Sequence, residues 1–242
     1  MRAPLRAGVV AAAVALAASC GTLPDMPPPV PADLVPTVAV PSLDPEESAR
    51  LSPDGFDAVQ RMAVRIRNVG CQGLSTGSGF ALDATTLITN RHVVADSESL
   101  QVNTYDGRDI DVSAASTAAL ADLAVVRTED ELPSAPELAE ADPEPGASVS
   151  VVGYPSGGAL TVTAGEVIGT TTDPLNENLG EVLVTDAPVE PGSSGSAALD
   201  EAGRVIGVVY AKTTDGRSLV VPQSTLRELL EDTSAFTPLP AC

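Results

Sequence analysis

The stretch GSGFALDATTLITNRHVV, residues 77–94, shows the kind of structure this chain forms. It contains two short apolar runs, 77–82 and 86–89, and the segment between them is mostly polar. Short runs with β-branched residues, bounded by turn-forming residues, are typical of β-strands. The same pattern of short runs broken by Gly, Asp and Asn continues to the end of the chain. It predicts one β-rich domain over residues 56–242.

The predicted strands form two sets of six, separated by an acidic, Pro-rich connector at 129–146. They are 62–68, 77–82, 86–89, 99–105, 109–113 and 123–127, then 148–152, 160–168, 181–185, 196–199, 205–210 and 218–221. Asp-Gly at 106–107 and Ala-Gly at 202–203 are hairpin-turn signals. We expect an all-β fold of two six-stranded antiparallel barrels, formed by residues 56–130 and 145–222. Three Leu residues at helical spacing predict a short C-terminal helix over 223–231.

The composition excludes several classes of function. The 242 residues include 13 Lys and Arg against 33 Asp and Glu, for a net charge of -20, so binding to nucleic acid or anionic lipid through a basic patch is not expected. Three Cys without a CxxC pair predict no metal site, and nothing in the sequence calls for a cofactor. The single His, His92, must carry any chemistry that needs imidazole.

The N-terminus has the features of an export signal. Residues 1–19 contain two Arg and then a thirteen-residue apolar stretch at 7–19, which is the size of a signal-peptide core and too short to span a membrane. Small residues precede Cys20 as in a bacterial lipoprotein cleavage site, which predicts lipidation at Cys20 and anchoring on the outer face of the cytoplasmic membrane. Ordinary secretion is the alternative. Residues 20–55 are rich in Pro and read as an extended tether.

Three segments contain candidate catalytic residues: TNRHVV at 89–94, ADLAVV at 121–126 and PGSSGSA at 191–197. Taken singly, each has an ordinary structural reading: a half-buried His, an acid before a strand, and a flexible Gly/Ser loop. However, the Gly/Ser run lies between two apolar strands of a compact domain, where a flexible linker is out of place.

Together with GSGF at 77–80, these motifs resemble the trypsin-like serine proteases, and most closely the bacterial branch of HtrA/DegP and MarP-like enzymes. The resemblance covers about residues 60–230 and implies a chymotrypsin-like fold. It also implies a serine endopeptidase of protein or peptide substrates with His92, Asp122 and Ser194 as its triad. The backbone N–H groups of Gly192 and Ser194 would then form the oxyanion hole.

The resemblance also places the pocket for the side chain that precedes the scissile bond. Its predicted walls are Ala187, Pro188, Val189, Val208 and Val209. In the family, an acid at position 188 would select Lys or Arg in the substrate. This chain has Pro188 instead, so a small or medium apolar side chain is expected before the scissile bond. Glu190 and Asp215 are acids near enough in sequence to alter that preference.

Two cysteines, Cys71 and Cys242, remain in the domain if Cys20 is lipidated. They are either two thiols or one disulfide, and disulfides persist in exported proteins. MarP-like proteases pair an early Cys with one near the C-terminus, so the resemblance implies a Cys71–Cys242 bond.

Three positions depart from the family pattern: Arg91, Ser193 and Ser196. Relatives commonly have Ala at position 91, Asn or Asp at position 193, and Gly at position 196. With Ser193, no ion pair to a newly formed N-terminal amine is possible, so activation by N-terminal cleavage is not expected. Ser196 would impair the loop if that position needs a positive φ. The alternative function is therefore a protease-like lipoprotein that binds peptides or a partner without cleaving them.

Overall fold

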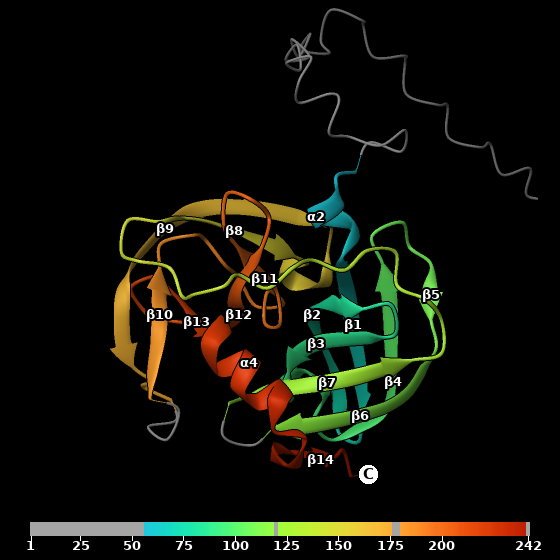
Figure 1. The fold of residues 1–242 in the computed structure, drawn as a ribbon. Helices are drawn as coiled ribbons and strands as arrows, with labels where there is room; N and C mark the ends of the chain where they lie inside the picture. The colour runs from blue at the N-terminus through green and yellow to red at the C-terminus, as the bar shows by residue number, and fades with distance from the viewer. Residues whose placement is uncertain (1–55, 119–120, 176–179, 241–242) are drawn as a thin grey trace, which may run out of the picture. The chain divides into compact units, whose positions relative to one another are not determined.

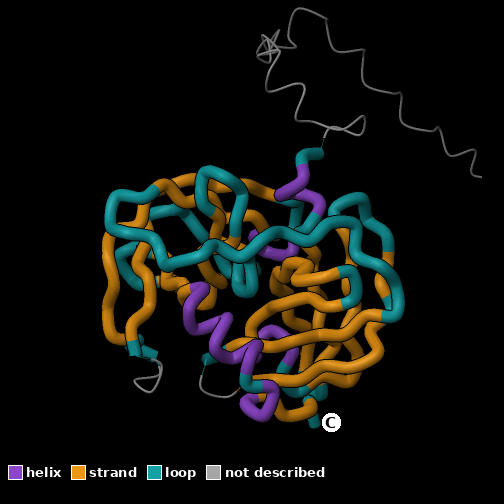
Figure 2. The backbone as a smooth tube through the Cα atoms, in the orientation of Figure 1, coloured by secondary structure: helices purple, strands orange, loops and turns teal. Residues whose placement is uncertain are grey.

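The computed structural model describes residues 56–118, 121–175 and 180–240 (Figures 1 and 2). The predicted signal peptide, Cys20, the tether and Cys242 lie outside these residues. In the part described, two β-sheets dominate, and all their strands except one near the C-terminus lie in the two sequence regions predicted for the two barrels. No helix among the described residues is long and apolar enough to cross a membrane.

The first half forms an eight-stranded sheet in the order β14-β6-β7-β3-β2-β1-β4-β5. Its strands are β1 Ala63–Gly70, β2 Gly73–Asp83, β3 Thr86–Asn90, β4 Ser97–Thr104, β5 Asp109–Ile110, β6 Val112–Ala118, β7 Leu123–Thr128 and β14 Phe236–Pro238. The prediction of a six-stranded barrel here is not confirmed. Asp111 alone separates β5, which pairs with β4, from β6, which pairs with β7. Its main chain bonds to Glu129 and to the Asp130 carboxylate, and the predicted single strand 109–113 is split at this point.

The second half is the closed six-stranded barrel that the sequence predicts, in the order β10-β13-β12-β11-β8-β9. Its strands are β8 Ser148–Gly153, β9 Thr161–Thr172, β10 Glu181–Thr185, β11 Ala197–Leu199, β12 Val205–Lys212 and β13 Ser218–Pro222. The Ala202-Gly203 turn signal is confirmed, because Gly203 has φ +76° and its N–H bonds to Asp200. Closure leaves this barrel with no unpaired edge strand.

The predicted C-terminal helix is confirmed as α4, Gln223–Glu231. Two one-turn helices, α2 (Ala58–Arg61) and α3 (Arg91–Val94), and the strand β14 were not predicted. Four residues are too few for a helical periodicity to show in a sequence. β14 follows α4 and pairs with β6, so the C-terminal segment returns to the first sheet (Figure 1).

Aliphatic side chains form the core, and one buried cluster joins the two halves. Phe80 and Leu123 of the first sheet pack in this cluster with Val208 and Tyr210 of the second barrel and with Leu226 of α4. With no Trp in the chain, Val, Leu and Ile supply most of the buried area. The shared core fixes the first sheet against the barrel, and the three candidate catalytic segments are divided between these two parts.

Cys71 follows β1 and is disulfide-bonded. Pairing with Cys242 stays a prediction, because Cys242 lies outside the described residues. The nearby contacts fit this pairing. The Cys71 N–H bonds to the Asp96 carbonyl, and Pro240, two residues before Cys242, lines a surface cavity with Ser97 and Ser99.

Candidate active site

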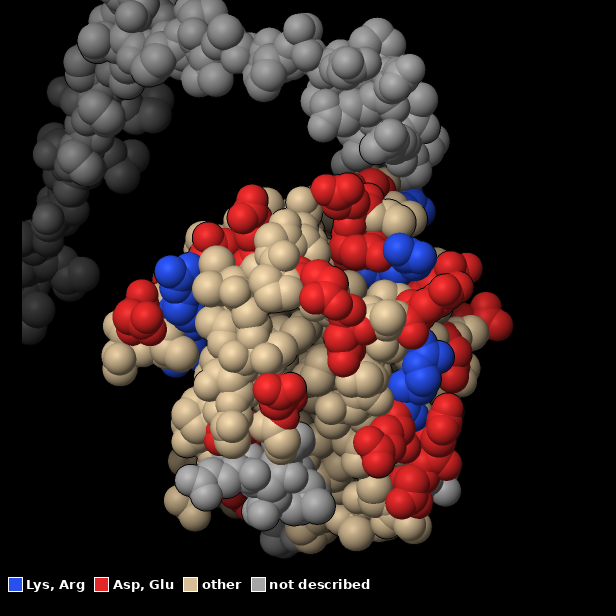
Figure 3. Space-filling model, turned by 60° about the vertical axis from the view of Figure 1, so that its left-hand side comes forward, with Lys and Arg blue, Asp and Glu red and all other residues tan. Residues whose placement is uncertain are grey.

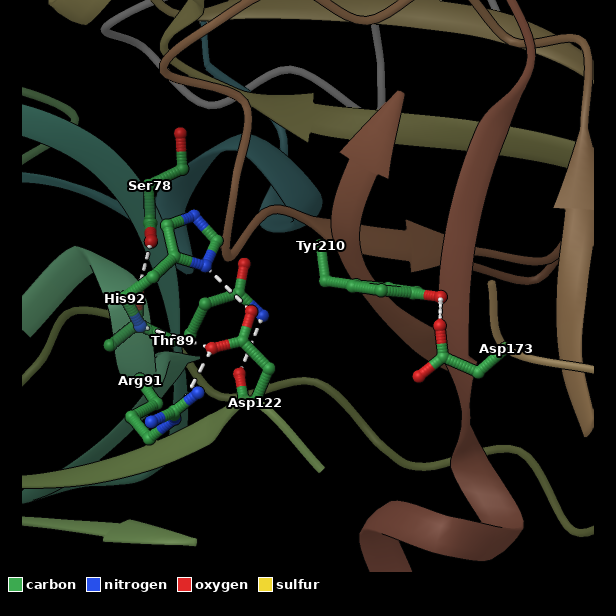
Figure 4. A network of polar contacts seen from close by, with 8 residues as sticks. Ser78, Thr89, Arg91, His92, Asp122, Asp173 and Tyr210 are labelled. Carbon is green, nitrogen blue, oxygen red and sulfur yellow. Dashed lines mark hydrogen bonds and ion pairs between the residues drawn. The ribbon is translucent and has the colours of Figure 1, made fainter. Parts of the chain in front are cut away.

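The pairing of β3 with β7 brings His92 and Asp122 together. Asn90 at the end of β3 faces Leu123 at the start of β7 in the antiparallel register. Residues just after Asn90 therefore lie beside residues just before Leu123. The chain turns into α3 directly after Asn90, and this turn carries the His92 side chain over Asp122 (Figure 4).

The His92 imidazole and the Asp122 carboxylate form a close hydrogen-bonded pair. Nδ1 of His92 lies 2.6 Å from Oδ2 of Asp122, and the His92 backbone N–H donates to Oδ1 at 3.0 Å. A carboxylate only accepts hydrogen bonds, so Nδ1 carries the proton and Nε2 is left as the basic nitrogen. Asp122 adopts φ +48°, and its carbonyl accepts from the Arg91 N–H and the Asn90 amide, which hold this unusual backbone.

Arg91 adds a positive charge beside this pair. Its Nε lies 3.8 Å from Oδ1 of Asp122, and its side chain is 47% exposed. Relatives commonly have a small residue here. The larger side chain lies beside the carboxylate with nearly half of its surface exposed (Figure 4).

Ser194 lies on a tight loop between β10 and β11. Gly192 and Gly195 have φ values of +95° and +87°, which glycine adopts without a steric penalty. The Ser193 N–H donates to the Glu190 carbonyl at 2.9 Å, and the Ser196 N–H donates to the Ser193 carbonyl at 3.0 Å. These turn bonds make the Gly/Ser run an ordered loop rather than a flexible linker.

The loop is attached to β2, which in turn bonds to β3, the strand that precedes His92. The Ser78 N–H donates to the Ser194 carbonyl at 2.8 Å, and Thr89 Oγ1 donates to the Ser78 carbonyl at 2.6 Å. Among the described residues, His92 Nε2 makes no hydrogen bond to the Ser194 hydroxyl. In ligand-free sites this bond is often long and tightens when substrate binds.

Two backbone N–H groups of the loop have no acceptor among the described residues. Neither the Gly192 N–H nor the Ser194 N–H donates to another group in the part of the chain described. The Pro191 carbonyl accepts from the Ser156 N–H at 2.6 Å, so the Gly192 N–H of the same trans peptide points the opposite way. A Cβ at position 192 would lie 2.6 Å from the Ser156 nitrogen, so only Gly fits.

A pocket of about 190 Å³ opens beside Ser194. Of the five predicted wall residues, Val189 and Val209 line it. Ala187 and Val208 are buried and do not line this pocket, so their role as walls stays a prediction. Successive side chains of a strand point to opposite faces, so Val208 points away when Val209 points into the pocket.

Pro188 does not line this pocket but a separate small cavity beside Val151, so its role as a wall also stays a prediction. Of the two acids named from the sequence, Glu190 lines the pocket and Asp215 does not. Lys212, which sequence reasoning missed, lines it too and pairs with Glu190 at 2.9 Å. A strand-end Lys gives no signal in the sequence that distinguishes it from other surface residues.

A buried polar pair lies further along β12. The Tyr210 hydroxyl donates to Asp173 Oδ1 at 2.7 Å, and both residues are at most 5% exposed (Figure 4). Burial, then the hydrogen bond and charge of Asp173, and then the charge of Asp122 raise the pKa of Tyr210. Tyr210 therefore stays a neutral donor over the physiological range. No group of three or more His, Cys, Asp or Glu among the described residues is arranged to hold a metal.

The surface carries the charge imbalance of the sequence. Acidic side chains outnumber basic ones on the face shown in Figure 3, and the chain as a whole has a net charge of -20. Such a surface repels polyanions.

Three comparisons connect these motifs to known proteins. A family model described as "Trypsin-like peptidase domain" matches residues 77–208, which contain all three candidate catalytic residues. The bovine mitochondrial serine protease HTRA2 is 35% identical over 166 residues, covering 65% of this chain and 36% of that protein. Serine protease Rv3671c of Mycobacterium tuberculosis is 31% identical over 193 residues, covering 74% of this chain and 47% of that protein.

The chain thus spans less than half the length of these two relatives. Among solved structures, the crystal structure of the Rv3671c protease in its active form superposes with a TM-score of 0.67 and 28% identity. The superposition covers 76% of this chain and 87% of the Rv3671c protease chain.

Proposed function

Because the chain belongs to the trypsin-like peptidase domain family, we propose that it is a serine endopeptidase with Ser194 as nucleophile, His92 as general base and Asp122 as the orienting acid. The observation that carries this proposal is the pair formed by His92 Nδ1 and Asp122 Oδ2 at 2.6 Å. It fixes the tautomer in which Nε2 can accept a proton. The order His, Asp, Ser along the chain is that of the chymotrypsin-type triad.

In the proposed reaction, the Ser194 hydroxyl oxygen attacks the carbonyl carbon of the scissile bond while His92 Nε2 takes its proton. The tetrahedral intermediate collapses, the C–N bond breaks, and His92 returns the proton to the leaving amine. Water then attacks the acyl-enzyme by the same route and regenerates Ser194. Asp122 stays ionised and stabilises the transient imidazolium.

The N–H groups of Gly192 and Ser194 are the proposed oxyanion hole. Both are available, and the positive φ of Gly192 together with the Pro191–Ser156 hydrogen bond supports the required orientation. In related systems each such donor contributes about 3 kcal/mol to transition-state stabilisation.

For specificity, we propose a small or medium apolar side chain before the scissile bond. Val189, Val209 and Ala211 give the pocket, of about 190 Å³, apolar walls. Glu190 lines the pocket, but its Oε1 forms an ion pair with Nζ of Lys212 at 2.9 Å. An incoming Lys or Arg therefore meets no unpaired carboxylate.

We further propose that the mature enzyme needs no new N-terminus to form its site. The Ser193 side chain accepts from the Glu190 N–H at 3.2 Å and has no charge to pair with an amine. Export is also proposed, with a lipid anchor at Cys20 and a Cys71–Cys242 disulfide. A relative from Hahella chejuensis is named a probable periplasmic serine endoprotease, which supports export but not the anchor.

The test compares the wild-type chain with Ser194→Ala for hydrolysis of a casein or peptide library. We expect cleavage by the wild type and none by the variant, with unchanged melting temperature and retained peptide binding. If the wild type binds peptides and cleaves none of them, the chain is the binding protein that forms the alternative function.

A further inference from the structure

Ser78 is a buried residue that contacts three segments of the candidate site. It lies in β2 with no exposed surface. The sequence offers Ser78 only as part of a strand motif, and none of the proposed catalytic roles uses it. Its side chain and main chain nevertheless make four hydrogen bonds at 2.6–2.8 Å to Tyr154, Gly192, Ser194 and Thr89.

The hydroxyl of Ser78 makes two of these bonds. It accepts from the Tyr154 N–H at 2.8 Å and donates to the Gly192 carbonyl at 2.8 Å. The Gly192 carbonyl belongs to the Gly192–Ser193 peptide. The preceding peptide, Pro191–Gly192, is held by the Ser156 N–H. The Ser78 hydroxyl and the Ser156 N–H thus hold the two peptides on either side of Gly192.

Gly192 needs such external support. At φ +95° only glycine fits, but glycine also has access to many other backbone conformations. A rotation of the peptides on either side of it would turn the Gly192 N–H away from the substrate. The carbonyl bond to Ser78 restricts this rotation.

The main chain of Ser78 connects the same loop to the general base. Its N–H donates to the Ser194 carbonyl, and its carbonyl accepts from Thr89, three residues before His92 (Figure 4). The side chain that holds Gly192 therefore belongs to a strand that also fixes Ser194 against the His92 segment.

We propose that Ser78 is a positioning residue whose hydroxyl holds Gly192 in the conformation that stabilises the oxyanion. The inference rests on the proposed function, because it assumes that Gly192 donates to the oxyanion. It predicts that loss of the hydroxyl weakens transition-state binding and leaves ground-state binding largely intact.

The experiment uses full chains of the wild type, Ser78→Ala and the control Ser97→Ala. Ser97 is a second buried serine, on β4, and its hydroxyl has no partner among the described residues. The readouts are kcat and KM for the best peptide anilide of the wild type, and inhibition by the aldehyde of the same peptide. The hemiacetal oxygen of the aldehyde adduct occupies the oxyanion position, so its affinity reports on Gly192.

For Ser78→Ala we expect kcat to fall by about 10- to 100-fold, less than the full loss of an oxyanion donor. KM should stay within about threefold, and aldehyde affinity should fall in parallel with kcat/KM. Ser97→Ala should match the wild type in all three. Ser78→Cys retains a weak hydrogen-bond donor, so its kcat should lie between those of Ser78→Ala and the wild type. This variant replaces Ser78→Ala in the test if Ser78→Ala does not fold.

Wild-type kcat and aldehyde affinity in Ser78→Ala would overturn this inference alone. A rise in KM without a fall in kcat would overturn it as well. A folded wild type that neither cleaves peptides nor binds the aldehyde would overturn the proposed function, and this inference with it.

Discussion

The hydroxyl of Ser196 occupies the space into which a side chain at position 153 would extend. A Cβ at Gly153 would collide with Ser196 Oγ and lie 2.8 Å from Ser78 Oγ. Position 196 also departs from the Gly that relatives have. The positive-φ residues other than Gly in the described part of the chain are Asp96, Asp122 and Ser156, so Ser196 needs no strained backbone. The departure therefore adds no positive-φ strain to the loop.

We accordingly expect Ser196→Gly to retain wild-type kcat within about threefold, because it leaves the loop hydrogen bonds in place. Gly153→Ala should destabilise the fold by about 1–3 kcal/mol through overpacking, as measured by urea unfolding. The double variant Gly153→Ala/Ser196→Gly should recover part of that loss, since it removes the colliding hydroxyl. Additive effects of the two changes would contradict the pairing of these positions.

Asp122→Asn should lower kcat by about 10⁴-fold. Both carboxylate oxygens of Asp122 accept hydrogen bonds from His92, and an amide presents a donor to one of them. The imidazole then takes the tautomer with its proton on Nε2, which cannot accept the Ser194 proton. Melting temperature serves as the fold control. Activity within tenfold of the wild type would remove Asp122 from the triad.

Peptide-library profiling should give a small or medium apolar residue such as Ala or Val before the scissile bond. Lys212→Ala should add cleavage after Lys and Arg, because it leaves Glu190 without its partner beside the pocket. Glu190→Gln is the matched control and should not add cleavage after Lys or Arg. A wild-type profile dominated by Arg or Lys would count against the proposed pocket.

The two buried tyrosines predict opposite stability effects. Tyr210→Phe should cost about 1–3 kcal/mol, because it leaves the buried Asp173 carboxylate with one partner fewer. The Tyr154 hydroxyl has no partner among the described residues, so Tyr154→Phe should be neutral or stabilising. Urea unfolding at neutral pH measures both. A larger loss for Tyr154→Phe than for Tyr210→Phe would contradict the observed hydrogen bonding.

The same tyrosines predict a loss of stability in alkali. Burial raises the pKa of Tyr154 to about 12 and, with Asp173 and Asp122, raises that of Tyr210. An unfolded tyrosine ionises near pH 10. Above that pH the unfolded chain binds fewer protons than the folded one, so the free energy of unfolding falls as pH rises. Unfolding curves from pH 8 to 11 should show this decline, and it should be shallower in Tyr154→Phe. An equally steep decline in that variant would contradict the role of Tyr154.

Much of the fold could be predicted because short apolar runs and turn signals are local features. All twelve predicted strands correspond to observed ones, though β5 and β6 divide one of them. The pairing of β3 with β7, which joins His92 to Asp122, is not among the predictions, because β4, β5 and β6 lie between these strands in sequence. β14 could not be predicted, because its three residues are fixed by pairing with β6 far away in sequence.

The pocket and the support of the loop depend on three-dimensional relationships that the sequence does not display. Lys212 and Glu190 are 22 positions apart, and Ser78 and Gly192 are 114 apart. Of the neighbours Val208 and Val209, which are both predicted as walls, only Val209 lines the pocket. Contacts of this kind become visible only once the two halves of the domain are packed together.

The most direct test of the central claim is labelling of the purified full chain with a fluorophosphonate, followed by peptide mass spectrometry. Only a serine activated by a nearby base reacts rapidly with this probe. We predict one adduct, on Ser194, in the wild type. We predict no adduct in Ser194→Ala and a strongly slowed reaction in His92→Ala. A folded wild-type chain that stays unlabelled, or a Ser194→Ala chain that labels as fast as the wild type, would contradict the assignment of Ser194, His92 and Asp122 as a catalytic triad.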